Sequence, residues 1–448
     1  MDVIVLSRIQ FLLTTVFHYF FVPITIGLSI IVAVFQTVGY VKKDEAYTKL
    51  SIFFGKLFIV NFAVGVVTGI IQEFQFGMNW AGYSRFVGDI FGAPLAIEAL
   101  AAFFLESTFI GVWLLGRNKL SPKVHNLSIW LVALGSTLSA YWILVANSFM
   151  QHPTGYSLNG GRAEMTDFAA VIFNQHALLQ FAHVVVTALL TASFFVLGIS
   201  AYRLLRKKNA DIFAKSFKFS VIVGLIFVIA SAFTGDLQGK FLVKEQPMKI
   251  AAAEALWDTA QPAPFAVIAG IDEANQKNTF EIAIPNLLSF LSYNNFTGEV
   301  KGIKDLQNEM SAELGDGNYV PPVAATFWSF RLMVGFAGLM LVLCILALAK
   351  WKNNRFADSK FLLGTSLVAI SFPYIANTSG WMMAELGRQP FIVYKLLTLD
   401  NAVSTTVAPG WVIFSSVGFV LIFVIAAVAD VVLIKRIAKE ELKEEARK

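Results

Sequence analysis

An acid and a base end one of the long apolar runs of this chain, in the stretch Gly380–Pro390, which reads G-W-M-M-A-E-L-G-R-Q-P. Glu385 and Arg388 are three residues apart, so on a helix they share one face. Charges beside lipid-length apolar sequence are costly unless they are paired, buried in protein or hydrated. One interpretation is an interfacial salt bridge that ends a helix, with Gly387 as C-cap and Pro390 as stop. The alternative is a functional site.

Other polar side chains favour the functional interpretation, because they also interrupt apolar runs: His18, Glu98, Glu106, His183 and Met333. Two imidazoles, a thioether and a carboxylate among helices are the ligand types of haem iron. Imidazole with thioether is an established axial pair for a low-spin haem of raised potential.

Each of these residues also has an ordinary structural interpretation. A lone histidine in a membrane helix is often an interhelical hydrogen-bond residue, and a lone methionine is usually a packing residue. His176 lies two turns before His183 on the same face, so spacing alone leaves both histidines as candidates. His125 and His152 fall in predicted connections, where we expect them to be solvated.

The elements that must position these residues are membrane-spanning helices. The chain has 448 residues, of which 56% are hydrophobic, and a mean hydropathy of +0.66; soluble domains usually have about 45–50% apolar residues. Its apolar runs exceed the roughly 20 residues that cross a bilayer. The single cysteine, Cys344, excludes an internal disulfide and a thiolate metal cluster.

The runs predict an all-α polytopic membrane protein with nine spans, at 9–40, 51–77, 91–116, 127–149, 170–203, 216–235, 323–349, 360–384 and 409–435. The first run is far longer than a signal-peptide core, so we expect it to be retained. We divide the chain into spans 1–6 (1–235, with His183 in span 5), an outward loop (236–322) and spans 7–9 (323–448).

Lys and Arg concentrate in alternate connections, at 41–50, 117–123, 203–218, 350–360 and 435–448. The positive-inside rule therefore predicts an outer N-terminus, a cytoplasmic C-terminus and an outward loop between spans 6 and 7. This short-segment pattern is a topology signal and does not indicate nucleic-acid binding.

The orientation gives each polar residue a depth, at about 1.5 Å per residue. His18, Glu98, His183, Met333 and Glu385 then fall in the outer half of the membrane on five different helices. Glu106 lies nearer the cytoplasm, about 80° around the helix from Glu98.

Nearly the whole chain resembles subunit I of the cytochrome bd quinol oxidases. The resemblance rests on L-S-R-I-Q-F with His18, E-F-Q-F-G at 73–77, G-D-I-F-G-A-P-L-A-I-E at 88–98 and F-F-L-E-S at 103–107. It continues through 130–147, Q-P-A-P at 261–264, F-R-L-M at 330–333 and the stretch Gly380–Pro390. The pattern departs at Phe391, where the family commonly has Trp, and the outward loop is short for the family.

The resemblance implies a quinol:dioxygen oxidoreductase with two b-type haems and one d-type haem. By matching positions, His183 and Met333 would bind the low-spin b haem, Glu385 the high-spin b haem and His18 the d haem iron. Arg331 would compensate propionate charge, and Trp381 and Arg388 would pack around the d haem. Nothing in the sequence distinguishes a d haem from a b haem at that site.

The resemblance also implies quinol oxidation at Lys249 and Glu254 in the outer loop, and a proton route through Glu98, Glu106 and Ser139. Oxygen reduced near the outer face would draw its protons from the cytoplasm, generating a proton-motive force without a pump. We expect a bacterial or archaeal cell membrane, a second large subunit, possible small single-span subunits and no nucleic acid.

A proton-coupled transporter without haem is the alternative function. It would explain Glu98 and Glu106, because intramembrane carboxylates are common in ion relays. It gives no role to the clustering of His18, His183, Met333 and Glu385 in the outer half.

Overall fold

The computed structural model describes residues 2–442, and within that range nine helical spans are long and apolar enough to cross a membrane. The spans are formed by α1 and α2 (Val3–Tyr19, Val22–Lys42), α3 (Glu45–Met78), α4, the π-helix η1 and α5 (Ala81–Ile97, Glu98–Phe103, Phe104–Gly116), α6 (Pro122–Gln151), α7 and α8 (Phe168–Ile172, Gln175–Leu205), α9 (Ala210–Glu245), α13 (Val323–Ala349), α14 and α15 (Lys360–Val368, Ser371–Leu386), and α17 (Pro409–Lys439). The predicted number and positions of the spans are confirmed. The end of the basic tail, 443–448, lies outside the described residues.

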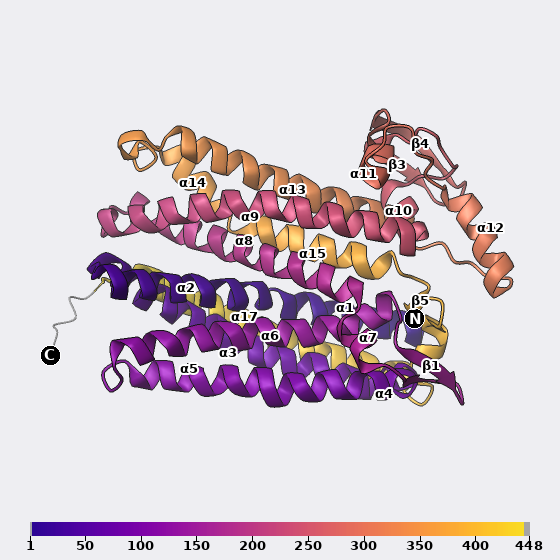
Figure 1. Ribbon diagram of the computed structural model, residues 1–448, viewed down its shortest axis with the longest axis horizontal. Helices are drawn as coiled ribbons and strands as arrows, with labels where there is room; N and C mark the ends of the chain where they lie inside the picture. The colour runs from indigo at the N-terminus through magenta and orange to yellow at the C-terminus, as the bar shows by residue number, and fades with distance from the viewer. Residues whose placement is uncertain (1, 443–448) are drawn as a thin grey trace.

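The spans form two groups that lie side by side (Figure 1). In the first group α2 packs on α3 and α6, and α5 packs on α6. In the second group α8 packs along α9, α13 along α15, and α14 against α8. Contact between α2 and α8 joins the groups, while α17 lies against α1 and α3. Each group therefore contains four consecutive spans, with the ninth added to the first.

Polar caps and proline set several helix starts. The Asp44 carboxylate accepts a hydrogen bond from Ala46 N at the start of α3, and the Asn174 side chain caps α8. α6 begins with the cap Ser121 followed by Pro122, a residue suited to the first helical position. Such side chains satisfy amide groups that the first turn of a helix leaves free.

Most spans extend beyond the predicted ends. The clearest difference is α9, which continues to Glu245, ten residues past the predicted end of span 6 at 235. These extra turns carry polar side chains such as Asp236 and Lys240, which form an i,i+4 ion pair at 2.6 Å. The apolar sequence ends where contact with lipid would end, whereas the helix continues into the outer loop.

The outer loop after α9 is a small folded unit. It consists of α10 (Pro247–Glu254), the antiparallel hairpin β3–β4 (Phe265–Asp272, Lys277–Ile284), α11 (Leu287–Tyr293) and α12 (Ile303–Leu314). Buried Met248, Trp257, Leu306 and Phe327 join α10 and α12 to the start of α13. Short pairs β1–β2 (Tyr156–Asn159, Arg162–Met165) and β5–β6 (Phe391–Val393, Leu397–Thr398), followed by α16 (Leu399–Ala402), cover the same end, and η2 (Lys352–Asn354) lies at the other.

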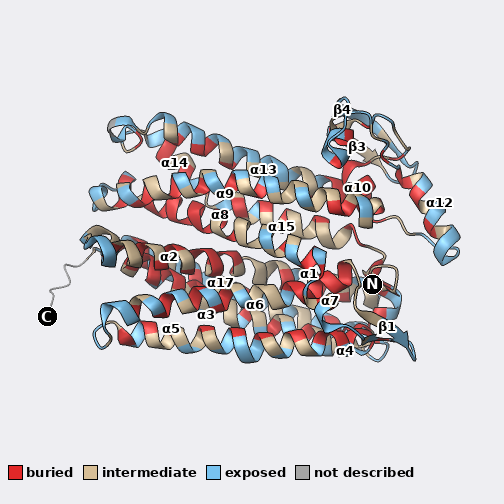
Figure 2. Cartoon of the chain, in the orientation of Figure 1, coloured by how far each residue is buried: buried red, intermediate tan, exposed pale blue. Residues whose placement is uncertain are grey.

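Both the loop unit and the start of α1 lie at one end of the bundle, and the last turn of α17 lies at the opposite end (Figure 1). Figure 2 shows buried residues where the helices face one another and exposed residues along the outer faces. α17 is the least covered span, with 11% of its most apolar window buried. Its apolar outer side suits contact with lipid or with another membrane subunit.

Candidate functional site

Each of the two histidines favoured from the sequence has one ring nitrogen bonded to a threonine of the following span. His18, at the end of α1, has its Nδ1 3.0 Å from Thr68 Oγ1 on α3. His183 on α8 has its Nδ1 2.8 Å from Thr234 Oγ1 on α9. This arrangement leaves Nε2 of each imidazole as the atom available to a metal, with the ring orientation fixed by the other nitrogen.

Met333 and Arg331 are two residues apart on α13 but have different surroundings. A Cβ at Gly380 of α15 would come within 2.8 Å of Met333 Sδ, so this glycine makes room for the thioether. Arg331 reaches into the outer loop, where its Nη2 is 2.6 Å from Glu254 Oε2 and its Nε donates to Ala266 O at 2.7 Å. Arg331 therefore neutralises Glu254 in this structure, and its role beside a propionate stays a prediction.

Glu385 lies in the last turn of α15, where three side chains hold its carboxylate. Asn147 Nδ2 and Gln151 Nε2 of α6 each donate to Oε1 at 3.1 Å. Oε2 pairs with Arg388, three residues further along the chain. The Arg388 side chain is only 3% exposed, and this burial argues against a hydrated interfacial salt bridge.

α10 connects the outer loop to this carboxylate site through Lys249. The Lys249 ammonium is 2.5 Å from Gln151 Oε1, and the same glutamine binds Glu385. Burial and the nearby Arg388 charge lower the pKa of Lys249 to about 7, although the Glu385 carboxylate opposes this shift. Lys249 therefore loses its charge in the neutral range.

Glu254, at the other end of α10, is the second ionisable group of the loop and lies by Arg331. Burial raises the pKa of Glu254 to about 7, even though the Arg331 charge and hydrogen bond act in the opposite direction. A cavity of about 340 Å³ is lined by Glu254, Trp257, Pro264, Ala266, Phe280 and Glu281. α10 thus places one titratable group by Glu385 and the other by the turn that carries Met333.

The two glutamates of the third span both face α6. Ser139 Oγ donates to Glu98 Oε1 at 2.6 Å, and Ser136 Oγ donates to Glu106 Oε1. Glu98 begins the π-helix η1, whose wider turn shifts the rotation between the two carboxylates. The expected 80° separation assumed a regular α-helix throughout, and the π-helix between the two residues removes that assumption.

Trp381 connects the helix of Glu385 with the helix of His18. Its ring stacks on Tyr19, with 5.7 Å between centroids and 15° between planes. Tyr19 directly follows His18 in α1, so the stack brings α15 and α1 together at this depth. The predicted positions of Trp381, Glu385 and His18 around one region of the outer half agree with this contact.

Several buried polar atoms of α3, of the start of α4 and of Arg388 have no hydrogen-bond partner within residues 2–442: Gln75 Nε2 and Oε1, Trp80 Nε1, Tyr83 Oη and Arg388 Nη1. Of these groups, Tyr83 lies within electrostatic range of the Arg388–Glu385 ion pair. Buried polar groups are normally paired. An amphipathic cofactor with carboxylates would supply such partners, and the free imidazole nitrogens, the thioether and Gly380 complete a set that fits haem.

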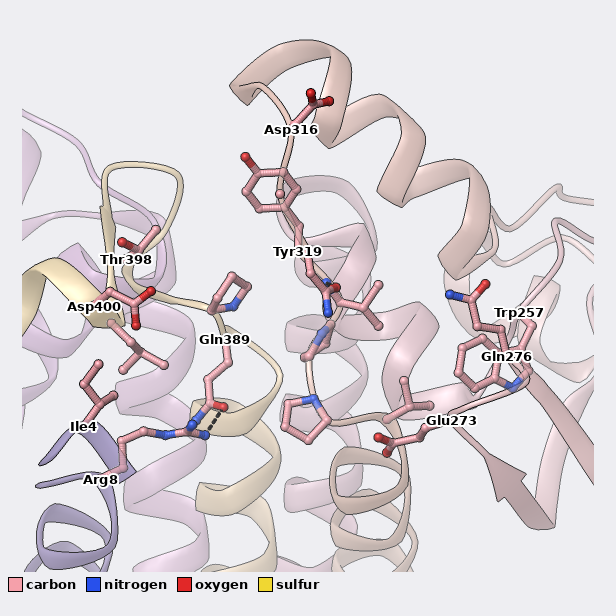
Figure 3. Close-up of a pocket in the computed structure, with 18 residues that line it drawn as sticks. Ile4, Arg8, Trp257, Glu273, Gln276, Asp316, Tyr319, Gln389, Thr398 and Asp400 are labelled. Carbon is pink, nitrogen blue, oxygen red and sulfur yellow. Dashed lines mark hydrogen bonds between the residues drawn. The ribbon is translucent and has the colours of Figure 1, made fainter. Parts of the chain in front are cut away.

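The larger outer cavity, of about 660 Å³, contains none of the residues predicted from the sequence. Figure 3 shows Arg8 of α1 pointing toward Gln389 on one side and Trp257 and Glu273 of the loop on the other. Arg8 donates to Gln389 Oε1, next to the buried Arg388. Phe391, the departure from the family pattern, is buried and stacks on Tyr319 of this region at 5.7 Å.

The structure separates the remaining histidines. His176 is buried near Ser148 Oγ, 3.5 Å from its Nδ1, among the α6 amides that lead to Glu385. The expectation that His125 is solvated is wrong: it is buried, and its Nε2 is 2.9 Å from Trp113 O. The first turn of α6 packs His125 against Trp113, which a hydropathy profile cannot indicate. His152, at the end of α6, is partly buried.

Three polar residues of interest have no place in the sequence-based hypothesis. Thr68 and Thr234 carry no charge, so composition offers no signal for them. Asp430 on α17 is 8% exposed, and its Oδ1 has no hydrogen-bond partner among the residues that the structure describes. A single acid within the apolar run 409–435 was a visible signal for Asp430, since such residues are rare in membrane helices.

Comparisons with known proteins agree along the full chain. The sequence pattern of the family described as cytochrome bd terminal oxidase subunit I matches residues 6–442. The chain is 49% identical over 443 residues to cytochrome bd ubiquinol oxidase subunit 1 of Bacillus subtilis, covering 98% of this chain and 94% of that protein. It is 36% identical to cytochrome bd-II ubiquinol oxidase subunit 1 of Escherichia coli, covering 98% and 96%.

A solved structure has the same fold. The bd oxidase from Geobacillus thermodenitrificans superposes with a TM-score of 0.87 at 29% identity, covering 97% of this chain and 98% of that one. The similarity includes the nine spans and the outer loop unit, which together account for nearly all described residues.

Proposed function

Because this chain belongs to the cytochrome bd terminal oxidase subunit I family, we propose that its residues assemble a quinol-oxidising site at the outer loop and an oxygen-reducing haem site beneath it. The protein is a multi-pass membrane subunit of a terminal respiratory oxidase with quinol oxidase activity. Being subunit I, it acts with a subunit II.

The observation that carries the proposal is the placement of Glu254. This carboxyl lies by the 340 Å³ cavity and pairs with Arg331, two residues before Met333. Its pKa of about 7 lets it accept a proton from quinol and release it at neutral pH. Quinol oxidation would thus take place beside the helix turn that carries a ligand for the first electron acceptor.

Haem would supply one-electron transfer and, at the oxygen site, the redox chemistry of dioxygen reduction. His183 and Met333 would hold a low-spin b haem, and Glu385 a high-spin b haem. His18 would hold a d haem, or a b haem in its place. Arg388 and Tyr83 offer polar hydrogens for cofactor carboxylates, and Trp381 fills the space between Tyr19 and α15.

Protons would reach the oxygen site from the cytoplasm along α6. Glu106 and Glu98 accept hydrogen bonds from serines three residues apart on that helix, so both carboxylates lie along one of its faces. A proton on Glu106 can therefore pass outward to Glu98, which carries charge across the membrane without a pumping element.

The sides of the membrane on which the chain ends lie follow from a proton route that starts in the cytoplasm. The N-terminus would lie outside and the C-terminus inside a bacterial or archaeal cell membrane. Subunit II, with any small single-span subunits, would cover part of the bundle. The segment 236–322, which begins with the last turns of α9, would form the quinol-oxidising unit between spans 1–6 and spans 7–9.

A dithionite-reduced minus air-oxidised visible spectrum of the purified complex tests the proposal first. A long-wavelength chlorin band beside b-type bands supports two b haems and one d haem. A spectrum with b-type bands alone would show that a b haem occupies the site proposed for the d haem. A colourless complex contradicts the haem sites and favours the transporter.

Variants then assign the ligands. His183→Ala or Met333→Leu should abolish the low-spin signal and leave the other haem bands. Thr326→Val is a matched control, because within residues 2–442 the Thr326 hydroxyl bonds no side chain and donates to the carbonyl of Pro322, the N-cap of α13. An unchanged low-spin spectrum in both ligand variants would refute this assignment.

A further inference from the structure

The same side-chain arrangement occurs twice in the chain, once in each group of four spans. In both cases a histidine Nδ1 meets the hydroxyl of a threonine on the next span, and a glycine directly follows that threonine. The histidine and threonine are separated by 50 residues for His18 and Thr68 and by 51 for His183 and Thr234. The following residues are Gly69 and Gly235.

Hydrogen-bond direction identifies the nitrogen that carries the proton. The Thr68 hydroxyl lies 2.9 Å from Gly65 O and 3.1 Å from Val64 O, within its own helix. The Thr234 hydroxyl likewise lies 3.0 Å from Ala230 O. A hydroxyl has one proton to donate but also accepts. With that proton directed at a backbone carbonyl, each threonine oxygen accepts from the imidazole, so Nδ1 is protonated.

Protonation of Nδ1 leaves the Nε2 lone pair free, as metal ligation by a neutral imidazole requires. A carboxylate would hold the same tautomer but would place another charge in the apolar interior. Threonine avoids that charge because its hydroxyl is also satisfied by the helix backbone.

The glycines leave room beside the rings. A Cβ at Gly69 would lie 3.1 Å from His18 Cε1, closer than ordinary van der Waals contact. A Cβ at Gly235 would lie 3.6 Å from His183 Cε1, an ordinary contact distance. The His18 ring is therefore packed against its glycine, while the His183 ring has slightly more space.

We propose that Thr68 and Thr234 are positioning residues that fix the tautomer and orientation of His18 and His183 for iron ligation through Nε2. The inference rests on the proposed function, since it requires that both histidines bind haem. Beyond that function, we propose that the neutral hydroxyls of Thr68 and Thr234 set the electron density of the two imidazoles. If the threonine hydroxyl no longer accepts a hydrogen bond from Nδ1, the imidazole donates less electron density to the iron. The ferrous state of the iron is then favoured over the ferric state.

Optical redox titration of the intact complex tests the inference with Thr234→Val, which removes the hydroxyl but keeps the side-chain shape. The low-spin haem should either be lost or show a ferrous-to-ferric ratio about tenfold higher at a fixed ambient potential. This change equals a rise of about 59 mV in the reduction potential of a one-electron couple. Thr234→Ser should restore the wild-type potential, and the haem at His18 should be unchanged. Thr68→Val should change the haem at His18 in the same way and leave the low-spin haem unchanged, and Thr68→Ser should restore the wild-type potential.

Wild-type potentials and haem contents in Thr68→Val and Thr234→Val would overturn the inference, as would serine variants that fail to restore them. Thr326→Val is again the control, since it removes an intramembrane hydroxyl without a histidine partner. A wild-type complex without haem would instead contradict the proposed function itself.

The glycines provide a second measurement. Gly69→Ala should displace the His18 ring and alter the spectrum of its haem, whereas Gly235→Ala should have the smaller effect on the His183 haem. Equal spectra for Gly69→Ala and the wild type would show that the ring is not held in this position.

Discussion

At the residue scale, Glu254 shows how burial and an ion pair can prepare one carboxyl for proton transfer. Its side chain is 5% exposed and its partner Arg331 is 8% exposed. Removing one member of a buried pair normally leaves an expensive isolated charge. The raised pKa of Glu254 means that protonation near neutral pH is accessible while the hydrogen bonds to Arg331 remain available.

We therefore expect quinol-driven oxygen consumption to rise with pH through about 7, because Glu254 must be deprotonated to accept the quinol proton. Glu254→Gln should remove this rise and lower turnover by about a hundredfold, the lower range for a proton-transfer group. The measurement is a pH profile at saturating quinol, with haem content determined for each sample.

Lys249→Met is the matched comparison, because Lys249 also titrates near pH 7 but lies by Gln151 and Glu385. It should keep the rising limb, whatever its turnover. A rising limb that survives in Glu254→Gln and disappears in Lys249→Met would assign the titration to the lysine.

At the element scale, the third span depends on a change of helix type. Pro94 lies four residues before Glu98, and the π-helix η1 begins at Glu98. Proline removes a backbone donor and disturbs the regular ladder. The wider turn that follows directs Glu98 and Glu106 toward serines of the same helix, α6.

Glu106→Gln should slow oxygen consumption by about a hundredfold while leaving the haem spectrum unchanged, because it blocks proton uptake without touching a ligand. Ser136→Ala should have a smaller effect, since it removes only the hydrogen bond to that carboxylate. Ser107→Ala is the control: its hydroxyl bonds Phe103 O within its own span. Wild-type turnover in Glu106→Gln would remove this residue from the essential route.

The limits of sequence-based prediction are clearest at this scale. The spans could be predicted because a bilayer demands continuous apolar length, and His18, His183, Met333 and Glu385 stand out by type. The π-helix could not, since hydropathy contains no information on hydrogen-bond register. The partners Thr68, Thr234 and Gln151 depend on contacts between distant helices, and threonine and glutamine are too common for composition to single them out.

At the scale of the whole molecule, every proposed step depends on which end of the bundle faces outward. The outer loop unit and the start of α1 share one end, and the last turn of α17 lies at the other (Figure 1). Basic residues favour the cytoplasmic side, and Lys119 lies in the connection between α5 and α6 at the end opposite the loop. In the proposed orientation Glu106 would lie between the cytoplasm and Glu98.

Cysteine labelling in intact cells tests this orientation, because the single native cysteine, Cys344, is buried and should not react. Ala274→Cys, in the exposed turn between β3 and β4, should react with a membrane-impermeant maleimide from outside. Lys119→Cys should react only after the cells are opened. The reverse result would put quinol oxidation on the cytoplasmic side, and protons for oxygen reduction would then enter from outside. Charge separation by this enzyme would have the opposite sign, which a respiratory oxidase that builds a proton-motive force cannot sustain.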